Sequence, residues 1–213
     1  MKLGVFGGTF NPIHMGHLRS AEEVREKLGL DKVIFVPARL PPHKTCENLA
    51  DPDFRLRLVR LAVAGNPAFE VSDLELTREG PSYSADTLRQ IRAAENPDEL
   101  WFIMGADQYR ELHTWFNFRE ILQTADLAVM LRPPFEAPQE PGQFMAGEFK
   151  PAAEGFIHQS GRRTMMIKVT PLAVSSTQVR EALAKGDTIR YLVPEVVRDE
   201  LLKKQDRART EVK

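Results

Sequence analysis

The sequence lacks the features that would place it outside a reducing compartment. Its single cysteine, Cys46, has no partner for an internal disulfide, and there is no CxxC or Cys/His finger spacing. No apolar stretch approaches the ~20 residues that a membrane-spanning helix needs. The opening residues, MKLGVFGG, reach glycines too early for a signal peptide. We therefore expect a soluble, cytoplasmic protein.

An excess of charge of either sign is also missing. Among 213 residues, 29 are Lys or Arg and 30 are Asp or Glu, so net charge favours neither a nucleic-acid nor a membrane partner. Two common phosphate motifs, GxGxxG and GxxxxGK[ST], do not occur. What is present is ordinary for one globular domain, with 42% hydrophobic and 28% charged residues. Any phosphate chemistry must therefore come from a local site.

Short apolar runs alternate along the chain with longer patterns of helical periodicity. The runs expected to form buried strands are LGVF from Leu3, Lys32–Pro37, Phe69–Leu76, Leu100–Gly105, Asp126–Leu131 and Met165–Val169. The helical patterns span Ser20–Leu30, Phe54–Gly65 and Ser84–Glu95, and another begins near Gly16. This order predicts parallel strands joined by helices. We expect one α/β domain over residues 1–202, Rossmann-like with a doubly wound parallel sheet, and a flexible tail over 203–213.

Two parts of this pattern carry further expectations. In the helix over Phe54–Gly65, Leu58, Leu61 and Ala62 share one face and the arginines lie opposite. Residues 132–163 interrupt the alternation with five prolines between positions 133 and 151. That segment is a mobile excursion, a surface insertion or an oligomer contact, and the sequence does not separate these.

The stretch GGTFNPIHMGH, residues 7 to 17, directly follows the first strand. Gly7 and Gly8 allow a tight turn and let a ligand approach the backbone with no Cβ in the way. The next helix would aim its free N–H groups at the same space, which makes a generic phosphate site. Ligands of such sheets bind beyond the carboxyl ends of the strands. The motif is therefore expected to lie at a binding site.

Two histidines make this motif more specific. If the helix starts near Met15, His14 lies at its mouth and His17 in its first turn. Imidazole donates hydrogen bonds to phosphate oxygens and carries charge near neutral pH. Both rings would then stabilise charge that develops on a transferring group. The alternatives are two packing or capping histidines, or a zinc site, although no third or fourth ligand has evident spacing.

GGTFNPIHMGH resembles the GGTF(D/N)PxHxGH signature of the nucleotidyltransferase superfamily with its T/HxGH element. Four further segments, PPHK (41–44), SYSADTL (82–88), GADQYRELHTW (105–115) and VSSTQVR (174–180), occur in the order and at the spacing of bacterial nicotinate-mononucleotide adenylyltransferases. The match covers most of the chain up to about Val197. It implies transfer of the adenylyl group of ATP to nicotinate mononucleotide, giving deamido-NAD and pyrophosphate in NAD biosynthesis. Mg²⁺ is expected through the ATP phosphates, with no other metal.

The resemblance also assigns site residues. The residues expected to act in catalysis are His17, His14, Lys44 and Arg180. Those expected to bind ATP are Gly7, Gly8, Thr9, Phe10, His14, His17, Gly105, Asp107, Ser175, Ser176, Thr177 and Arg180. Those expected to bind nicotinate mononucleotide are Asn11, His43, Lys44, Tyr83, Thr87, Asp107, Trp115 and Arg132. Ser84 replaces the family's usual threonine, which leaves the details of pyridine recognition open.

Several of these residues also have simpler interpretations. Ser175, Ser176 and Thr177 are typical of an ordinary capped helix start, and the resemblance adds the ATP phosphates. Asp107 follows a buried strand, where a carboxylate suits ribose hydroxyls, a magnesium shell or a helix cap. Trp115 would ordinarily lie in the core, whereas the resemblance implies stacking on the pyridine ring.

Three other functions stay open at this stage. A related transferase would use phosphopantetheine or another mononucleotide as its acceptor. A sensor or regulatory module would bind nucleotides without turning them over. A nucleic-acid-binding protein would need a basic face, which the sequence does not provide. Oligomeric state and the preference for the acid over nicotinamide mononucleotide are not readable from the residues.

Overall fold

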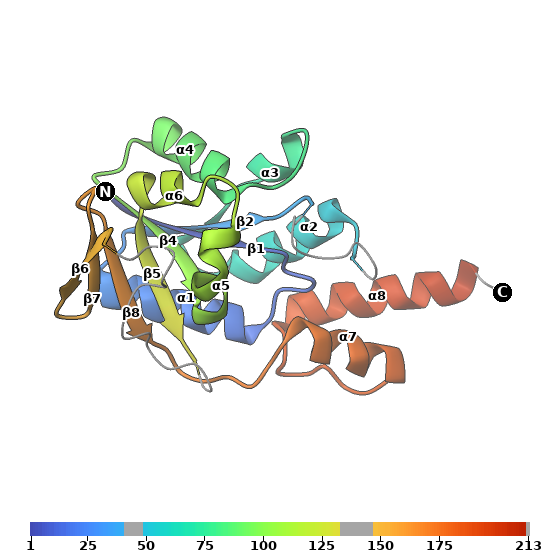
Figure 1. The fold of residues 1–213 in the computed structure, drawn as a ribbon. Helices are drawn as coiled ribbons and strands as arrows, with labels where there is room; N and C mark the ends of the chain where they lie inside the picture. Colours follow the sequence, from blue (N-terminus) through green and yellow to red (C-terminus); the bar gives the residue numbers. More distant parts are fainter. Residues whose placement is uncertain (41–48, 133–146, 212–213) are drawn as a thin grey trace.

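The computed structural model describes residues 1–40, 49–132 and 147–211, and these form one sheet with helices on both faces (Figure 1). The strands are β1 Lys2–Gly8, β2 Lys32–Pro37, β3 Phe69–Val71, β4 Glu99–Gly105, β5 Asp126–Leu131, β6 Phe149–Ala152, β7 Gly155–His158 and β8 Arg163–Lys168. The eight-stranded sheet has the order β3-β2-β1-β4-β5-β8-β7-β6. Every pairing from β3 to β8 is parallel. The predicted α/β fold is confirmed.

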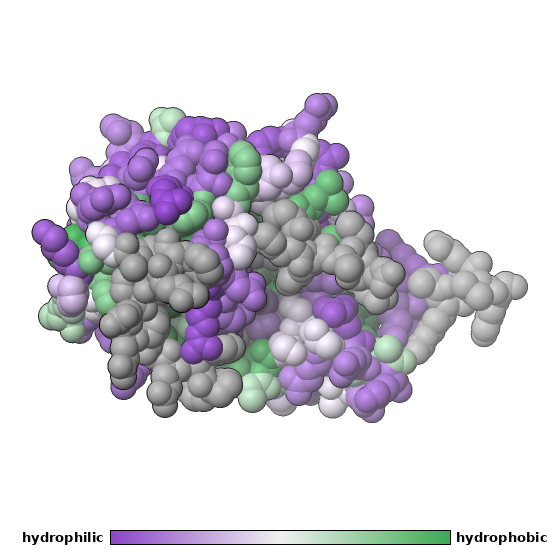
Figure 2. Space-filling view, viewed as in Figure 1, coloured by the Kyte–Doolittle hydropathy of each residue, from purple (hydrophilic) through white to green (hydrophobic). Residues whose placement is uncertain are grey.

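The helices form a layer on each side of the sheet. They are α1 Met15–Leu28, α2 Pro52–Val63, α3 Leu74–Thr77, α4 Ser84–Glu95, α5 Ala106–Glu111, α6 Phe118–Thr124, α7 Ser176–Lys185 and α8 Glu195–Glu211, with a 3₁₀ turn at Leu112–Thr114. One apolar core joins α1, α2, α7 and α8 to the sheet, and a second joins α4, α5 and α6. The outer surface of α3, α4 and α6 is mainly hydrophilic (Figure 2). Within the described residues, no helix has the length and apolarity to cross a membrane.

Local signals in the sequence fix where helices start and stop. Helix α2 begins after Asp51, whose carboxylate accepts from the Phe54 N–H, with Pro52 at the first helical position. Helix α1 ends at Gly29, which adopts a left-handed conformation with φ of 61°. These ends position the turn that leads into β2 and the end of the loop that follows β2.

The order in which the chain adds strands to the sheet reverses beside β1. From β1 the chain proceeds to β2 and β3 on one side, and then returns to β4 and β5 on the other side of β1. In open α/β sheets, ligands bind at such a switch point, beyond the carboxyl ends of the strands. Here those ends are Gly8 of β1 and Gly105 of β4. Both glycines belong to predicted ATP-binding motifs.

Two details of the sheet go beyond or depart from the sequence predictions. Only Phe69–Val71 of the run to Leu76 is a strand, and the chain then turns into the short helix α3, where Asp73 O accepts from the Leu76 N–H. The interrupted segment contributes the antiparallel strands β6 and β7 at the sheet edge. Gly155 permits this hairpin, because its φ is 149° and a Cβ there would overlap the Thr164 carbonyl. The sheet is therefore mostly, rather than wholly, parallel.

The expected separation of leucines and arginines on α2 is wrong for Arg55. Its side chain is fully buried and shares the inner face with Leu58 and Val59, three and four residues on. Leu61 and Ala62 are only partly buried. The guanidinium stays inside because backbone carbonyls accept all of its hydrogen bonds that involve described residues.

The last helix crosses the expected domain boundary. Helix α8 runs without a break through residue 202 to Glu211. It packs along α2, with Arg57 paired to Glu200 at 2.6 Å and Lys204 Nζ 4.0 Å from the centre of the Phe54 ring. These contacts attach the helix to the body of the domain.

Candidate active site

The backbone after β1 is shaped by the packing of Phe10. The Phe10 ring is buried and lies over Gly8, where a Cβ would come within 2.9 Å of it. It meets the ring of His17 in an edge-to-face arrangement, with centroids 5.1 Å apart. Phe10 has a positive φ of 44°. The missing side chain of Gly8 therefore makes room for Phe10, and only the backbone of Phe10 is available to a ligand.

His14 and His17 form a stacked pair at the start of α1. Their ring centroids are 3.6 Å apart and the planes differ by 25°. His14 is the N-cap residue, and its backbone N–H donates to His17 Nδ1 at 3.3 Å. Because Nδ1 of His17 accepts a hydrogen bond, the proton of its neutral ring lies on Nε2. The predicted start of this helix at Met15 is confirmed.

The expectation that both imidazoles carry charge near neutral pH is wrong for His14. Its side chain is buried, and burial together with the charge of Arg132 lowers its pKa to about 4. The buried Nδ1 of His14 has no hydrogen-bond partner among the described residues. His14 is therefore neutral at pH 7, and only one of its two ring nitrogens carries a proton.

Helix α7 contacts the GGTFNPIHMGH segment, so two motifs that were both expected to bind ATP lie together. Ser175 caps the helix by accepting from the Gln178 N–H at 3.1 Å. The Ser176 hydroxyl donates to the Pro12 carbonyl at 2.9 Å, and Arg180 Nη1 donates to the Asn11 carbonyl at 2.8 Å. Residues more than 160 positions apart are thus joined directly.

Arg180 has a second contact on its own helix. Its Nη2 donates to the Thr177 hydroxyl at 3.2 Å, so the guanidinium lies between α7 and the loop after β1. The side chain is only half-buried. A guanidinium held in this way can meet a phosphate with its remaining donors.

A cavity of about 420 Å³ opens beside these contacts. Its lining residues are Ala106, Asp107, Met130, Arg132, Pro171, Leu172, Ala173, Val174, Ser175 and Gln178. They come from the start of α5, the end of β5 and the segment that leads into α7. The cavity therefore lies on the β4–β5 side of the switch point and contains an exposed carboxylate and a guanidinium.

Gly105 directly precedes Ala106 and Asp107, which line this cavity. A Cβ on Gly105 would collide with Asp107 Oδ1 and would lie 3.7 Å from Arg132 Nη2. The two side chains thus converge over one glycine. Arg132, expected to contact nicotinate mononucleotide, lies among residues expected to contact ATP, and its charge also reaches His14.

The aromatic residues expected at the pyridine ring lie just before α4 and just after the 3₁₀ turn that follows α5. Tyr83 stacks on Phe116, with centroids 4.3 Å apart and planes at 27°. Trp115 is half-buried and meets Phe102 of β4 edge-on at 6.3 Å. Phe116 is half exposed. An aromatic surface is therefore present at this position of the fold.

Thr87 is held inside the protein. Its hydroxyl lies 2.6 Å from Glu75 Oε1 and accepts from Arg78 Nη2 at 3.2 Å. Burial raises the pKa of Glu75, and hydrogen bonds from Thr87 and Ser82 and the charge of Arg78 oppose it. Ser82 Oγ in turn accepts the N–H of Leu40 at 3.3 Å. Thr87 thus supports the SYSADTL segment through protein contacts, while His43 and Lys44 lie outside the described residues.

This chain resembles known proteins along most of its length. A model of the family described as cytidylyltransferase-like matches residues 5–182. The chain belongs to the cytidylyltransferase-like family. It is 44% identical over 198 residues to a probable nicotinate-nucleotide adenylyltransferase of Trichlorobacter lovleyi, covering 91% of this chain and 93% of the relative. A protein of the same description from Geobacter sulfurreducens is 42% identical over 205 residues, with 92% and 94% covered.

Solved structures of similar fold agree with the architecture. The nicotinic acid mononucleotide adenylyltransferase of Plasmodium falciparum, complexed with APC, superposes with a TM-score of 0.72 at 14% identity, and 96% of each chain is covered. Its complex with NaAD gives a TM-score of 0.73 at 15% identity, with 95% of each chain covered. At these identities the likeness shows the fold alone.

Sequence reasoning missed part of the site in this cytidylyltransferase-like chain. Met130, Leu172 and Gln178 line the cavity, and Arg55 holds the backbone of Thr9. The only signal for Gln178 was its place inside VSSTQVR. Apolar residues at strand ends and an arginine in an amphipathic helix have many other uses, so their patterns did not point to a site.

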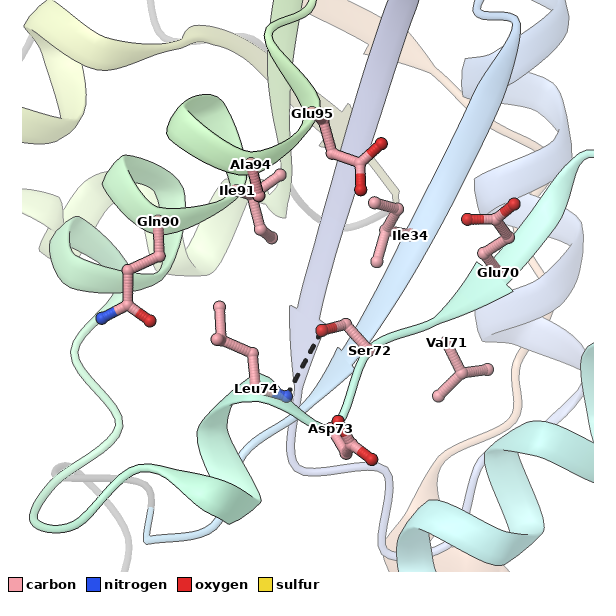
Figure 3. A pocket seen from close by; sticks show the side chains of 10 residues that line it. All are labelled: Ile34, Glu70, Val71, Ser72, Asp73, Leu74, Gln90, Ile91, Ala94 and Glu95. Atoms are coloured by element: carbon pink, nitrogen blue, oxygen red, sulfur yellow. Dashed lines mark hydrogen bonds between the residues drawn. The ribbon is translucent and has the colours of Figure 1, made fainter.

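A second cavity of about 290 Å³ lies away from these motifs, between the β2–β3 edge and α4 (Figure 3). Its carboxylates are already paired in part, Glu70 with Lys32 at 2.6 Å and Asp73 with Arg60 at 2.9 Å. No group of three or more His, Cys, Asp or Glu side chains among the described residues is arranged to hold a metal. The chemistry of the predicted motifs is therefore centred on the switch point.

Proposed function

We propose that this chain transfers the adenylyl group of ATP to nicotinate mononucleotide, forming nicotinate adenine dinucleotide and pyrophosphate. The relatives that match over nine-tenths of the chain carry that activity in their names. The balance of charge and the single cysteine support a cytoplasmic setting for this step of NAD biosynthesis.

One observation carries the proposal. The two predicted phosphate motifs, far apart in the sequence, are bonded to each other through Ser176–Pro12 and Arg180–Asn11 beside the 420 Å³ cavity. A nucleotide in the cavity would have its phosphates near the stacked histidines and the α7 N-terminus. Backbone N–H groups and basic side chains at a helix start are the groups that bind phosphate in proteins.

The chemistry requires no general base. An oxygen of the mononucleotide's phosphate, already anionic, attacks the α-phosphorus of ATP and forms the new P–O bond. The bond from the α-phosphorus to the bridging oxygen breaks, and pyrophosphate leaves with the electron pair. Catalysis is then positioning and stabilisation of charge at the α-phosphate.

Side chains of the site fit these roles in different ways. His17 donates through Nε2, and Arg180 adds a fixed positive charge. His14 is neutral and supports the pair by stacking and by its backbone bond to His17. Lys44 remains in the proposal on the strength of its motif alone.

A magnesium ion fits as a companion of the triphosphate. Mg²⁺ in such sites is held by one or two carboxylates together with substrate phosphates, and the cavity offers the exposed carboxylate of Asp107. When bound, the ion neutralises charge on the phosphates of ATP. Asp107 would hold it or orient the ribose of the nucleotide.

Aromatic side chains support the binding of nicotinate mononucleotide, the acceptor of the adenylyl group. Tyr83 stacks on Phe116, the neighbour in sequence of Trp115, and Trp115 contacts Phe102 of β4. Flat rings of this kind bind a pyridine ring by stacking. Asn11 adds a polar side chain next to the phosphate site, where its Oδ1 accepts from the Ala50 N–H at 3.1 Å.

The deciding experiment measures pyrophosphate release from ATP and magnesium, with nicotinate and nicotinamide mononucleotides assayed side by side. We expect release with the acid and a much lower kcat/KM with the amide. Equal use of both would keep the reaction and reject the preference for the acid. Release with neither, but with phosphopantetheine, would reject the acceptor, and ATP binding without release would reject the enzyme.

A further inference from the structure

Arg55 is a fully buried cation whose partners among the described residues are all backbone carbonyls. Its Nη1 donates to the carbonyls of Thr9 and Ala38, each at 2.7 Å. Nη2 donates to Arg39 O at 3.3 Å, and Nε donates to Ala50 O at 2.9 Å. Burial lowers the pKa of Arg55 while Asp51 opposes the shift, and a guanidinium remains protonated in proteins.

These carbonyls belong to three separate segments. Thr9 follows β1, Ala38 and Arg39 follow β2, and Ala50 precedes α2. A further bond from the Ala38 N–H to Gly8 O at 2.9 Å continues the pairing of the two strands. Arg55 therefore fixes the turn after β1 to both neighbours at the switch point of the sheet.

The bond to Thr9 also sets the direction of the next N–H group. In a trans peptide, the C=O of one residue and the N–H of the following residue point in opposite directions. The Thr9 carbonyl points inward to Arg55, so the Phe10 N–H points away from it. With its ring buried, Phe10 can meet a ligand only through this N–H and its other backbone atoms.

We propose that Arg55 is a positioning residue for adenylyl transfer, which holds the Thr9 carbonyl inward so that the Phe10 N–H faces a substrate phosphate. This inference rests on the proposed function, because it needs a triphosphate at the end of β1. The guanidinium also places a positive charge behind the motif, where weak screening in the interior lets it favour an anion. No contact between Arg55 and substrate is required.

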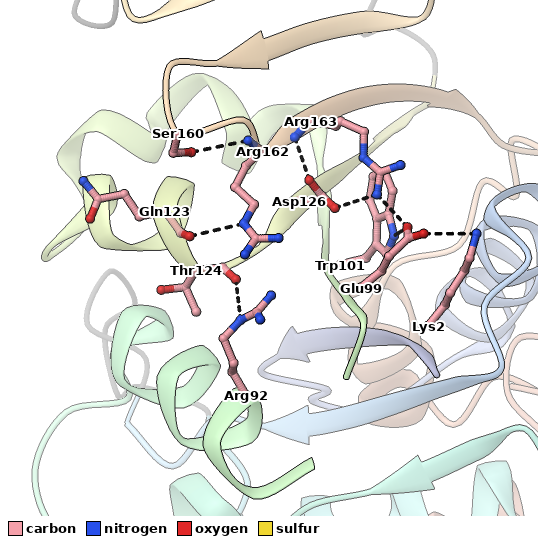
Figure 4. A network of polar contacts seen from close by, with 10 residues as sticks. All are labelled: Lys2, Arg92, Glu99, Trp101, Gln123, Thr124, Asp126, Ser160, Arg162 and Arg163. Carbon is pink, nitrogen blue, oxygen red and sulfur yellow. Dashed lines mark hydrogen bonds and ion pairs between the residues drawn. The ribbon is translucent and has the colours of Figure 1, made fainter. Parts of the chain in front are cut away.

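Two variants separate geometry from charge. Arg55→Lys keeps the charge, but one ammonium with three donors cannot reproduce the planar fork that reaches carbonyls of three segments. Arg55→Met removes both. Arg92→Lys is the matched control, because Arg92 Nε also donates to a backbone carbonyl, Thr124 O at 2.8 Å, and this contact joins the last turn of α4 to the end of α6 (Figure 4).

For each variant, thermal unfolding is recorded first, and kcat and KM are then measured well below the transition. We expect Arg55→Lys to fold and to lose about 10²-fold in kcat, the effect of misplacing reacting groups by roughly 1 Å, with a smaller rise in KM for ATP. Arg92→Lys should keep the wild-type kcat. A wild-type kcat in folded Arg55→Lys would overturn the proposal, as would an equal loss in the control.

A measurement on the unmodified protein does not depend on how the variants fold. The ¹⁵N–¹H resonance of Phe10 is followed while ATP and magnesium are added without acceptor. We expect a large shift of this resonance, whereas an unmoved Phe10 signal in protein that binds ATP would overturn the assignment. Because no turnover is involved, a wrong acceptor would reject the proposed reaction and leave this result standing.

Discussion

At the scale of single residues, two adjacent histidines have different environments and therefore different chemistry. His14 is buried beside Gly16 and the ring of His17, and this burial, together with the charge of Arg132, lowers its pKa. His17 is half-buried, with its Nδ1 already accepting a hydrogen bond. Both histidines belong to the same sequence motif. Only their packing in the structure distinguishes His14, a buried support, from His17, the proposed donor.

Replacing His17 with alanine should remove most of the activity and leave the fold. We expect kcat to fall by about 10²–10³-fold, the usual loss when one donor to a developing oxyanion is removed. The lost bond to the His14 N–H should cost about 1 kcal/mol of stability, as for a helix cap. Steady-state kinetics and thermal unfolding check both. A turnover near that of the wild type would show that His17 is not the donor.

The lowered pKa of His14 makes the stability depend on pH in a defined window. Between pH 6.5, the ordinary value, and about pH 4, the unfolded chain binds a proton at this ring that the folded protein does not. Stability therefore falls as the pH is lowered through this window, by on the order of 3 kcal/mol in full, and is unaffected above it.

The measurement compares urea unfolding of the wild type and of His14→Gln from pH 7.5 to pH 4. The difference in free energy of unfolding between the two proteins should shrink as the pH falls. A difference that stays constant over this range would show that His14 titrates normally in the folded state.

At the scale of elements, the start of α1 packs closely against the segment that precedes α7, and Gly16 makes this close packing possible. A Cβ on Gly16 would lie 3.0 Å from Val174 Cγ1 and 3.1 Å from His14 Nδ1. The Met15 N–H is also bonded, to Leu192 O at 3.0 Å. The end of helix α1 that is expected to face phosphate is thus assembled from chain segments on both sides of α7.

Gly16→Ala should therefore lower activity even though alanine favours a helix by up to about 1 kcal/mol. We expect kcat to fall by about tenfold, because the new methyl group displaces His14 or Val174 by a few tenths of an ångström. Gly65→Ala is the control, since a Cβ there meets nothing within 4 Å. The control should gain about 0.4–1 kcal/mol of stability with unchanged kinetics. Equal kcat values in Gly16→Ala and Gly65→Ala would show that the close approach at Gly16 does not affect activity.

Most elements were predictable from the sequence, and the exceptions have local causes. Buried parallel strands such as Lys32–Pro37 and Asp126–Leu131 are continuous apolar runs, which periodicity identifies directly. The edge strand β6 is largely exposed and reads FKPA, so it has no apolar pattern. The buried guanidinium of Arg55 was missed because its acceptors are carbonyls of distant segments, which no residue type reveals. The His14 pKa depends on desolvation, which exists only after folding.

At the scale of the whole molecule, the predicted site and an extended polar network occupy opposite ends of the sheet. At the amino ends of the strands, Arg163 donates to Asp126 and to Glu99, and Lys2 pairs with Glu99 (Figure 4). Burial alone raises the pKa of Glu99, but bonds from Arg163, Lys2 and Trp101 outweigh it and hold the pKa at about 2. This end of the sheet serves stability.

Asp126→Asn should accordingly destabilise the protein and spare its kinetics. Asp126 is buried and accepts from both the backbone N–H and Nη2 of Arg163, at 2.6 and 2.8 Å. Loss of the charge should cost about 1–3 kcal/mol. Chemical unfolding gives the free energy, and KM for ATP is measured in parallel. A changed KM for ATP with unchanged stability would show that the amino ends of the strands act in substrate binding and not in stability.

The bonds from Ser176 to Pro12 and from Met15 to Leu192 have a consequence for how the protein is made. A ribosome releases the first strand and its histidines early, at about 5–20 residues per second. Their partners on α7 and before α8 emerge only after some 160 further residues. A nascent chain can therefore build its first strands and helices while it has no complete phosphate site. The proposed catalytic centre is therefore completed only after α7 and the segment that precedes α8 have been synthesised.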